Sequence, residues 1–270
     1  MRPAVFRALC DVAYTQAGIR LTDEKLALVS ARVGKRLRAL GLSSEEQYLE
    51  VLQRRDGREL VEFLDVISTN FTSFFREPAH FDRLAAELGA ALARGQDTFR
   101  VWCAASSSGE EPYTIALVLE ELFKGRLVDW KVLATDISTR VLAQAKRGRY
   151  RAQQLKTVRR DLLANHFTPA QVDDDELHYD VAAHLRARLT FARLNLAQPP
   201  YPMRGPFDAI LCRNVMIYFD GPIRQTVVGE LERLVRPGGL VFVGHAETLS
   251  GLSTSLEVVV PSVYRKPGGP

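Results

Sequence analysis

The chain has 270 residues, 46% of them hydrophobic and 25% charged, which is typical of a globular protein with one sizeable core and a smaller second domain. The net charge of +4 permits an acidic partner or nucleic acid without demanding either. The cysteines, Cys10, Cys103 and Cys212, show no metal or disulfide spacing, so we expect a protein of the reducing cytoplasm. No signal peptide and no apolar run near the roughly 20 residues of a membrane span is apparent, so we expect no membrane insertion.

Residues 1–68 predict a small bundle of helices. Apolar residues recur at helical spacing, and Gly18 and Gly41 stand where the first two helices should end. A third helix is expected to begin at Ser43 and a fourth to span 58–67.

One face of the second predicted helix is basic. Its charged side chains are Arg32, Lys35, Arg36 and Arg38. Such a stripe is usually a solvated face, but it could also dock on an acidic helical surface or follow a phosphate backbone.

Residues 69–78, TNFTSFFREP, join the bundle to the rest of the chain. Three aromatic residues alternate with short polar ones, and Arg76 follows them. We expect Phe71, Phe74 and Phe75 to anchor this linker on the sheet; in the simplest alternative they only dock the bundle and Arg76 is solvated. Pro78 is expected to begin a helix that continues through Leu92.

The stretch from Val101 to Leu119 predicts a buried strand, a turn of five small residues ending at Gly109, and a helix. This is the first crossing of a doubly wound α/β sheet, where ligands bind. The turn lacks the glycines and lysine of a phosphate loop and carries Glu110 and Glu111 instead, which suits a cationic group such as an amine. Alternatively the two acids only favour the positive helix end, an explanation with more weight for Glu110 than for Glu111.

The second predicted strand, 131–135, is followed by Asp136, which lies 27 residues after Gly109. An acid at about this distance accepts the ribose hydroxyls in nucleotide-binding folds. Asp136 could equally cap the helix that Ser138 begins. Together with the small-residue turn, it predicts an adenosine-type ligand.

The rest of the chain predicts further α/β elements after a helix over 140–146 and a long irregular stretch from 147 to about 186. The expected elements are strands over 189–191, 207–212 and 240–244, a helix over 222–235, and a hairpin over 256–261 and 263–265. Polar residues stand just past the ends of the predicted strands, where an open sheet binds its ligand. They are Glu111, Asp136, Asn195 and Asn214.

Five stretches together resemble the CheR-type chemotaxis receptor glutamate O-methyltransferases. They are the turn with its two acids, TNFTSFFREP, ATDISTRVL, GPFDAILCRNVMIYFD and RPGGLVFVGHAETL, and the match spans nearly the full chain. The resemblance implies an α/β fold, with a class I S-adenosylmethionine-dependent methyltransferase (Rossmann-like) sheet and a small all-α N-terminal domain. It implies a receptor-facing helical domain over 1–68, a linker over 69–78 that contributes to the active site, and a catalytic domain over 79–270.

The resemblance also implies a cofactor site. Asn70, Thr72 and Arg76 of the linker would contribute to its pocket. Glu111 would hold the methionine amino group, and Asp136 would hold the ribose.

Further along the chain, Asn195-Leu196 would flank the adenine, and Arg213-Asn214 would line the cofactor near its sulfur. Tyr218, with Arg76, would face the reacting methyl, so these two are the expected catalytic residues.

The implied reaction moves a methyl group from S-adenosylmethionine to a glutamate carboxylate in the cytoplasmic helical domain of a receptor. That carboxylate is already ionised near neutral pH, so no general base is needed. We expect a monomer. We also expect no metal ion, because no histidine shows a second metal-type ligand at helical spacing. The basic helix face (Arg32, Lys35, Arg36 and Arg38) would contact the receptor.

One segment departs from the pattern of the resembled family. Some members carry a glycine-bearing loop ahead of the third strand, which binds a C-terminal receptor pentapeptide. Here residues 164–189 contain no glycine. We therefore expect methylation that is independent of such a peptide; whether 166–188 forms a β-subdomain is left open.

Two other functions remain at this point. A nucleic-acid methyltransferase would use the same cofactor domain, although aromatic stacking residues are missing beside the basic stripe. A non-catalytic S-adenosylmethionine-binding regulator is disfavoured by the presence of Arg76, Asn214 and Tyr218.

Overall fold

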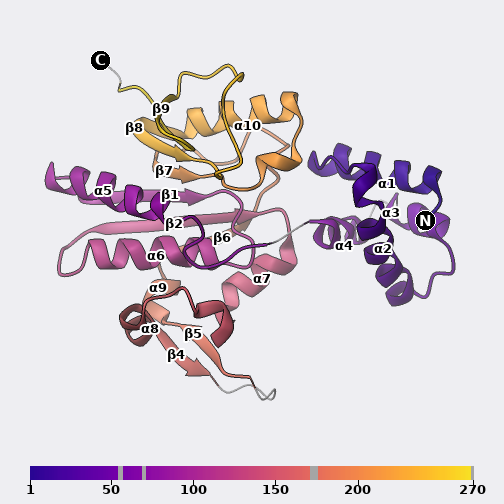
Figure 1. The fold of residues 1–270 in the computed structure, drawn as a ribbon, viewed down its shortest axis with the longest axis horizontal. Coiled ribbons are helices and arrows are strands. Elements are labelled where there is room, and N and C mark those ends of the chain that lie inside the picture. Colours follow the sequence, from indigo (N-terminus) through magenta and orange to yellow (C-terminus); the bar gives the residue numbers. More distant parts are fainter. Residues whose placement is uncertain (54–56, 69–70, 171–175, 269–270) are drawn as a thin grey trace.

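The computed structural model describes residues 1–53, 57–68, 71–170 and 176–268. Figure 1 shows a helical bundle on one side and a larger sheet domain on the other. No helix within the described ranges is long and apolar enough to cross a membrane.

The bundle has a hydrophobic core of its own. Leu9, Val29 and Phe63 are almost completely buried in it. Gly18 and Gly41 follow the first two long helices with φ values of +68° and +66°, as expected of residues that end a helix. The predicted bundle is confirmed, and its helices are α1 (Pro3–Ala17), η1 (Asp23–Lys25), α2 (Leu26–Leu40), α3 (Glu45–Leu52) and α4 (Arg58–Ile67).

The sheet domain is built on seven strands in the order β6-β2-β1-β7-β8-β10-β9. The first five are parallel, and the C-terminal hairpin adds two antiparallel strands at one edge. The strands are β1 (Thr98–Cys103), β2 (Asp129–Asp136), β6 (Leu189–Arg193), β7 (Phe207–Leu211), β8 (Val235–Phe242), β9 (Glu257–Val260) and β10 (Val263–Arg265). The predicted α/β fold with a doubly wound sheet is confirmed.

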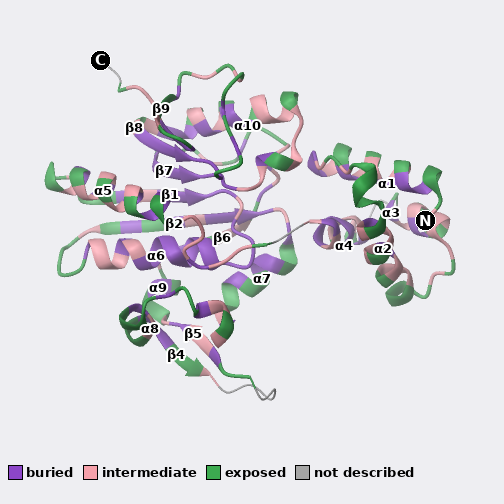
Figure 2. Ribbon diagram, viewed as in Figure 1, coloured by how far each residue is buried: buried purple, intermediate pink, exposed green. Residues whose placement is uncertain are grey.

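Side chains alternate between two cores along the central strand. Val101 and Cys103 face the core that contains α5 (Ala79–Ala93) and α6 (Glu110–Leu122), whereas Trp102 faces the core that contains α10 (Gly221–Leu234). Figure 2 shows the resulting buried layer through the middle of the domain. Because β1 lies between β2 and β7, the chain changes direction across the sheet here, which opens a crevice at the strands' carboxyl ends.

In the stretch predicted to be irregular, 147–186, the described residues 147–170 and 176–186 instead form an ordered subdomain. Its elements follow α7 (Thr139–Arg147) and are β3 (Arg149–Arg151), η2 (Ala152–Leu155), α8 (Arg160–His166), β4 (Phe167–Ala170), β5 (His178–Val181) and α9 (Ala183–Arg186). The strands form an antiparallel sheet in the order β3-β5-β4, and Arg149 binds Asp180 through two hydrogen bonds of 2.7 and 2.8 Å. The strands have only three or four residues each, so they carry little periodic signal.

Candidate functional site

A cavity lies at the carboxyl ends of the central strands, between the sheet, the linker and the bundle. The bundle contributes wall residues that include Ile19 and Leu21. The described residues that the sequence assigned to the site all line it: Thr72, Arg76, Glu111, Asp136, Asn195, Leu196, Arg213, Asn214 and Tyr218. Asn70, also assigned to the site, lies outside the described residues.

The turn before α6 brings Glu111 to the cavity wall. Gly109 has a φ of +103°, and a Cβ there would collide with the Tyr150 hydroxyl and with Ala145, so glycine is required. The Glu111 carboxylate accepts a hydrogen bond of 2.6 Å from Arg213 and one of 3.3 Å from the Cys103 thiol. Burial raises the pKa of Glu111, and the Arg213 cation offsets part of that rise.

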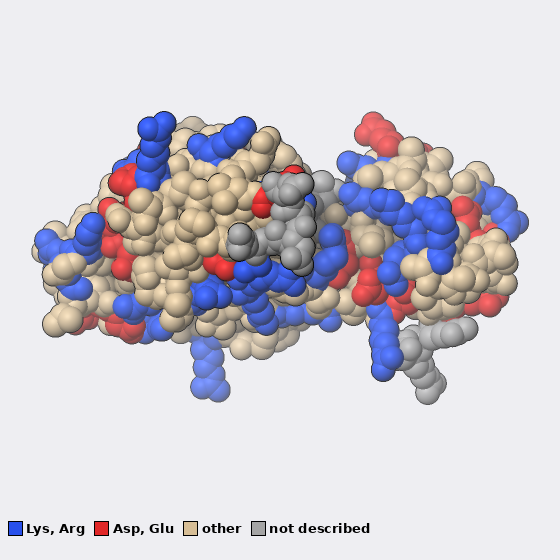
Figure 3. All heavy atoms as spheres, turned by 90° about the horizontal axis from the view of Figure 1, so that it is seen from below, with Lys and Arg blue, Asp and Glu red and all other residues tan. Residues whose placement is uncertain are grey.

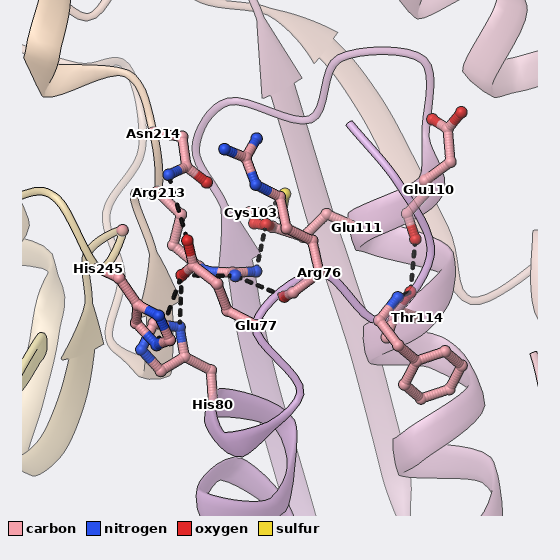
Figure 4. Close-up of polar contacts among 12 residues, drawn as sticks. Arg76, Glu77, His80, Cys103, Glu110, Glu111, Thr114, Arg213, Asn214 and His245 are labelled. Carbon is pink, nitrogen blue, oxygen red and sulfur yellow. Dashed lines mark hydrogen bonds and ion pairs between the residues drawn. The ribbon is translucent and has the colours of Figure 1, made fainter. Parts of the chain in front are cut away.

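Glu110 is not among the residues that line the cavity, and in Figure 4 its side chain points away from Arg213 and Glu77. Its carboxylate accepts hydrogen bonds from the Ser108 hydroxyl at 2.7 Å and from Gln154 at 3.0 Å. Burial raises the pKa of this carboxyl as well. The two adjacent acids in the first turn of α6 therefore have different surroundings, and only Glu111 faces the cavity.

Asp136 ends β2 and is buried. Its two oxygens accept hydrogen bonds from the backbone N–H groups of Ser107 at 2.8 Å and Ser138 at 2.9 Å. The N-cap of α7 (Thr139–Arg147) is Ser138, whose hydroxyl accepts from Val141. Burial raises the pKa of Asp136, and these backbone donors oppose the rise. The alternative that Asp136 caps this helix is therefore wrong, because Ser138 is the N-cap; Asp136 binds the backbone of Ser138 and lines the cavity.

The bundle is tied to the cavity wall by several hydrogen bonds. The Asn195 amide donates to the carbonyl of Gln16 at 2.7 Å, and the Tyr218 carbonyl accepts from the backbone of Arg20 at 3.0 Å. Asp65 of α4 accepts from the backbone N–H of Thr139 at 3.1 Å. These contacts make the bundle part of the cavity.

The linker anchors through fewer aromatic residues than predicted. Phe74 is buried in the core and Phe75 is half-buried, but Phe71 is 76% exposed. The expectation that all three anchor the linker is therefore wrong for Phe71. Its ring lies under the Arg76 guanidinium instead, at 5.4 Å, and Arg76 donates a hydrogen bond of 2.9 Å to the Phe71 carbonyl.

Arg213 connects the linker to the sheet. Its side chain is fully buried and donates to the carboxylates of Glu111 at 2.6 Å and Glu77 at 2.9 Å, and to the carbonyl of Arg76 at 2.6 Å. Burial opposes its charge, but the two carboxylates keep its pKa above the ordinary value. Glu77 was not predicted as a site residue, and its position directly after Arg76 was the one signal for it.

Glu77 also faces two histidines, His80 and His245 (Figure 4). The expectation that no histidine has a second metal-type ligand at helical spacing is wrong, because Glu77 precedes His80 by three residues. Burial is the main cause that lowers the pKa of His80 to about 4, and the nearby Arg213 cation is the second.

The basic stripe is not one uniform surface. Arg32 donates hydrogen bonds of 2.5 and 3.1 Å to the carbonyls of Val66 and Ser68. Arg36 binds Glu59 through two hydrogen bonds of 2.9 and 2.6 Å. Both arginines therefore hold α2 against α4, which corrects the prediction of four available charges. Lys35 and Arg38 are exposed.

Two family models match the sequence of this chain. The model of the CheR methyltransferase all-alpha domain matches residues 4–68, and that of the CheR methyltransferase SAM binding domain matches residues 70–264. The chain belongs to the CheR methyltransferase family.

Relatives that match almost the whole chain support the same family. The chemotaxis protein methyltransferases of Salmonella typhimurium and Escherichia coli are each 39% identical over 262 residues, covering 97% of this chain and 89% and 90% of theirs. Chemotaxis protein methyltransferase 2 of Pseudomonas aeruginosa is 36% identical over 259 residues, covering 96% of this chain and 91% of its own. This CheR methyltransferase is an S-adenosylmethionine-dependent enzyme.

A solved structure, a putative S-adenosyl-L-methionine-dependent methyltransferase from Methanococcus maripaludis, aligns with 70% of this chain and 88% of its own. Its TM-score is 0.38 and its identity 12%.

Proposed function

We propose that this CheR methyltransferase methylates glutamate side-chain carboxylates of chemotaxis receptors, giving methyl esters and S-adenosylhomocysteine. The relatives are named for chemotaxis. The observation that supports a carboxylate substrate concerns Arg76. This residue lines the cavity and pairs with no carboxylate within the described part of the chain. A guanidinium so placed can bind an incoming carboxylate through two parallel hydrogen bonds.

We propose that the cavity binds the cofactor along its length. A buried carboxylate at Glu111 suits the methionine ammonium, and the acceptor oxygens of Asp136 suit the ribose hydroxyls. The buried side chain of Leu196, with Asn195, offers a wall for the adenine. In this arrangement Arg213-Asn214 would lie nearest the sulfur.

When bound, S-adenosylmethionine supplies a methyl whose bond to sulfur breaks as a bond to the substrate carboxylate oxygen forms. The substrate carboxylate is ionised near neutral pH, because its ordinary pKa is about 4.3, so no side chain needs to remove a proton. Arg76 and Tyr218 are proposed to align the carboxylate and exclude water around it.

Labelled methyl transfer tests this function. Cofactor labelled in the methyl group is incubated with receptor-bearing membranes or with RNA. We expect label in the receptor fraction that mild alkali releases as methanol, as an ester requires. Alkali-stable label in RNA would instead favour a nucleic-acid substrate, and no transfer to either would contradict the proposed receptor substrate.

Asp136→Asn should weaken binding of S-adenosylmethionine and S-adenosylhomocysteine equally, because both carry the same ribose. The loss should be roughly tenfold, the lower end of the effect of a charged hydrogen bond. Asp65→Asn is the matched control, since Asp65 also binds the start of α7 but does not line the cavity. Calorimetry that finds only one ligand affected, or equal losses in both variants, would contradict the ribose role.

Receptor docking is proposed to involve the exposed part of the basic stripe, Lys35 and Arg38. On the face shown in Figure 3, basic side chains gather over the bundle. Neutralising both residues should raise the KM for receptor roughly twofold to thirtyfold at low salt, since each exposed ion pair contributes about 0.2–1 kcal/mol. The KM should also depend less on salt, while cofactor affinity should not change.

Exposed Arg94 and Arg126 provide the control, because they follow α5 and α6 at the opposite end of the sheet. Neutralising them should leave the salt dependence as it was. Unchanged receptor kinetics in the Lys35 and Arg38 variant would show that these two side chains belong to a solvated face and do not contact the receptor.

Deleting the C-terminal tail of a receptor should not reduce its methylation. The proposal rests on the glycine-free segment 164–189, part of which, 171–175, lies outside the described residues. The measurement compares initial rates on intact and truncated receptor at equal concentration. A strong loss on truncation would show dependence on a tail peptide.

A further inference from the structure

Three side chains with metal-binding atoms converge where the linker, α5 and the loop after β8 meet (Figure 4). The Glu77 carboxylate oxygen Oε2 is 3.4 Å from His80 Nδ1 and 3.9 Å from His245 Nε2. All three ligand atoms lie within 4.8 Å of one another. Tetrahedral zinc with bonds of about 2.0–2.2 Å holds such atoms roughly 3.3–3.5 Å apart. The three side chains are therefore close to the spacing that a metal ion imposes.

The hydrogen bonds of His80 leave a lone pair facing Glu77. The Ser262 hydroxyl lies 2.6 Å from the Pro261 carbonyl, which can only accept, and 2.7 Å from His80 Nε2, so the tautomer that makes both contacts hydrogen bonds has His80 Nε2–H donating to Ser262. In this tautomer the lone pair of the ring is on Nδ1, which is buried and has no hydrogen-bond partner within the described ranges. Two acceptors thus face each other at 3.4 Å, which a cation between them would satisfy.

The charge of the surroundings permits a cation. Arg213 is paired with both Glu77 and Glu111, so its single positive charge is shared between two carboxylates. The hydrogen bond from Arg213 to Glu77 resembles the outer contacts that usually orient a ligating carboxylate. In the same way, Ser262 fixes the orientation of the buried His80 ring.

We propose that Glu77, His80 and His245 form a site for a divalent transition metal ion, with zinc the best match. Two imidazoles and one carboxylate are a ligand set that zinc accepts, with a fourth position left open. The His245 side chain is 58% exposed, so it can turn toward an ion that enters from solvent. The ion would hold the linker, α5 and the loop after β8 together beside the cofactor cavity.

Metal titration tests the site. Untagged protein stripped with a chelator is titrated with Zn²⁺ against a chromophoric chelator, and with Co²⁺ to record the visible spectrum of a four-coordinate ion. We expect one equivalent per chain. The principal variant is His245→Ala, which removes an exposed ligand; His80→Ala is the second. Each should weaken binding at least about tenfold, since even outer-shell changes cost 10–100-fold.

His184→Ala is the matched control. His184 Nε2 lies 3.2 Å from His166 Nδ1, while Glu121 lies 3.5 Å from His166 Nε2, so this second cluster uses opposite nitrogens of one ring and cannot converge on one ion. Zn²⁺ should raise the melting temperature of the wild type and the control but not of His245→Ala. The proposal is overturned if the wild type binds no equivalent, if His245→Ala binds as tightly, or if the control loses binding.

Discussion

Glu111→Gln should weaken S-adenosylmethionine binding about tenfold to a hundredfold. The methionine ammonium would lose a charge-assisted partner worth roughly 1.5–3 kcal/mol. The substitution leaves Arg213 with a carboxylate partner, because Arg213 also binds Glu77 at 2.9 Å. Calorimetry with S-adenosylmethionine and S-adenosylhomocysteine measures the effect, which should be similar for both.

Two controls separate the ammonium contact from a general disturbance of the turn. Glu110→Gln removes the adjacent buried acid, which faces Ser108 and Gln154, and should change affinity little. 5′-Methylthioadenosine keeps the ribose and adenine but lacks the amino group, so Glu111→Gln should bind it as the wild type does. Unchanged S-adenosylmethionine affinity, or an equal loss for the truncated ligand, would remove Glu111 from the ammonium site.

Arg76→Ala and Arg76→Lys should each reduce turnover on receptor at least about tenfold, that is, by roughly 1.4 kcal/mol or more in the barrier. Lysine keeps the charge but loses the planar pair of donors that matches a carboxylate. The Arg76 guanidinium stacks on the ring of Phe71, which is largely exposed. The guanidinium therefore lies at the rim of the cavity and not in the core. Single-turnover methylation of receptor gives the rate directly.

Binding of S-adenosylhomocysteine distinguishes the two roles proposed for Arg76. It should fall much less than turnover does, because the carboxylate clamp acts on the substrate. Phe71→Leu is a useful companion: it removes the stacking ring but keeps the backbone carbonyl that Arg76 binds. Near-normal turnover in Arg76→Ala would exclude the clamp, and parallel loss of product binding would make Arg76 a cofactor residue only.

Much of the cavity could be predicted because its positions follow from local patterns. A strand, a small-residue turn and a helix predict where β1 ends, and parallel strands bring their carboxyl ends to one edge. Glu111, Asp136 and Asn214 stand just past such ends, so their side chains meet at one cavity although they are far apart in sequence.

The parts that could not be predicted depend on contacts between distant segments. The pairing of Arg36 with Glu59 joins two helices, and a helical pattern gives only the face that Arg36 occupies. Glu77 adopts a φ of +57°, a conformation uncommon outside glycine, and this turn lets one carboxylate meet both Arg213 and His80. No local spacing indicates such a conformation.

A crystal structure with S-adenosylhomocysteine tests the central claim most directly, namely that the cavity at the strand ends holds the cofactor in one orientation. We expect its ammonium within hydrogen-bonding distance of Glu111, its ribose hydroxyls on Asp136, its adenine against Leu196, and its sulfur facing the side of Arg76 and Tyr218. A ligand bound outside this cavity, or bound in it with the adenine at Glu111, would contradict the account.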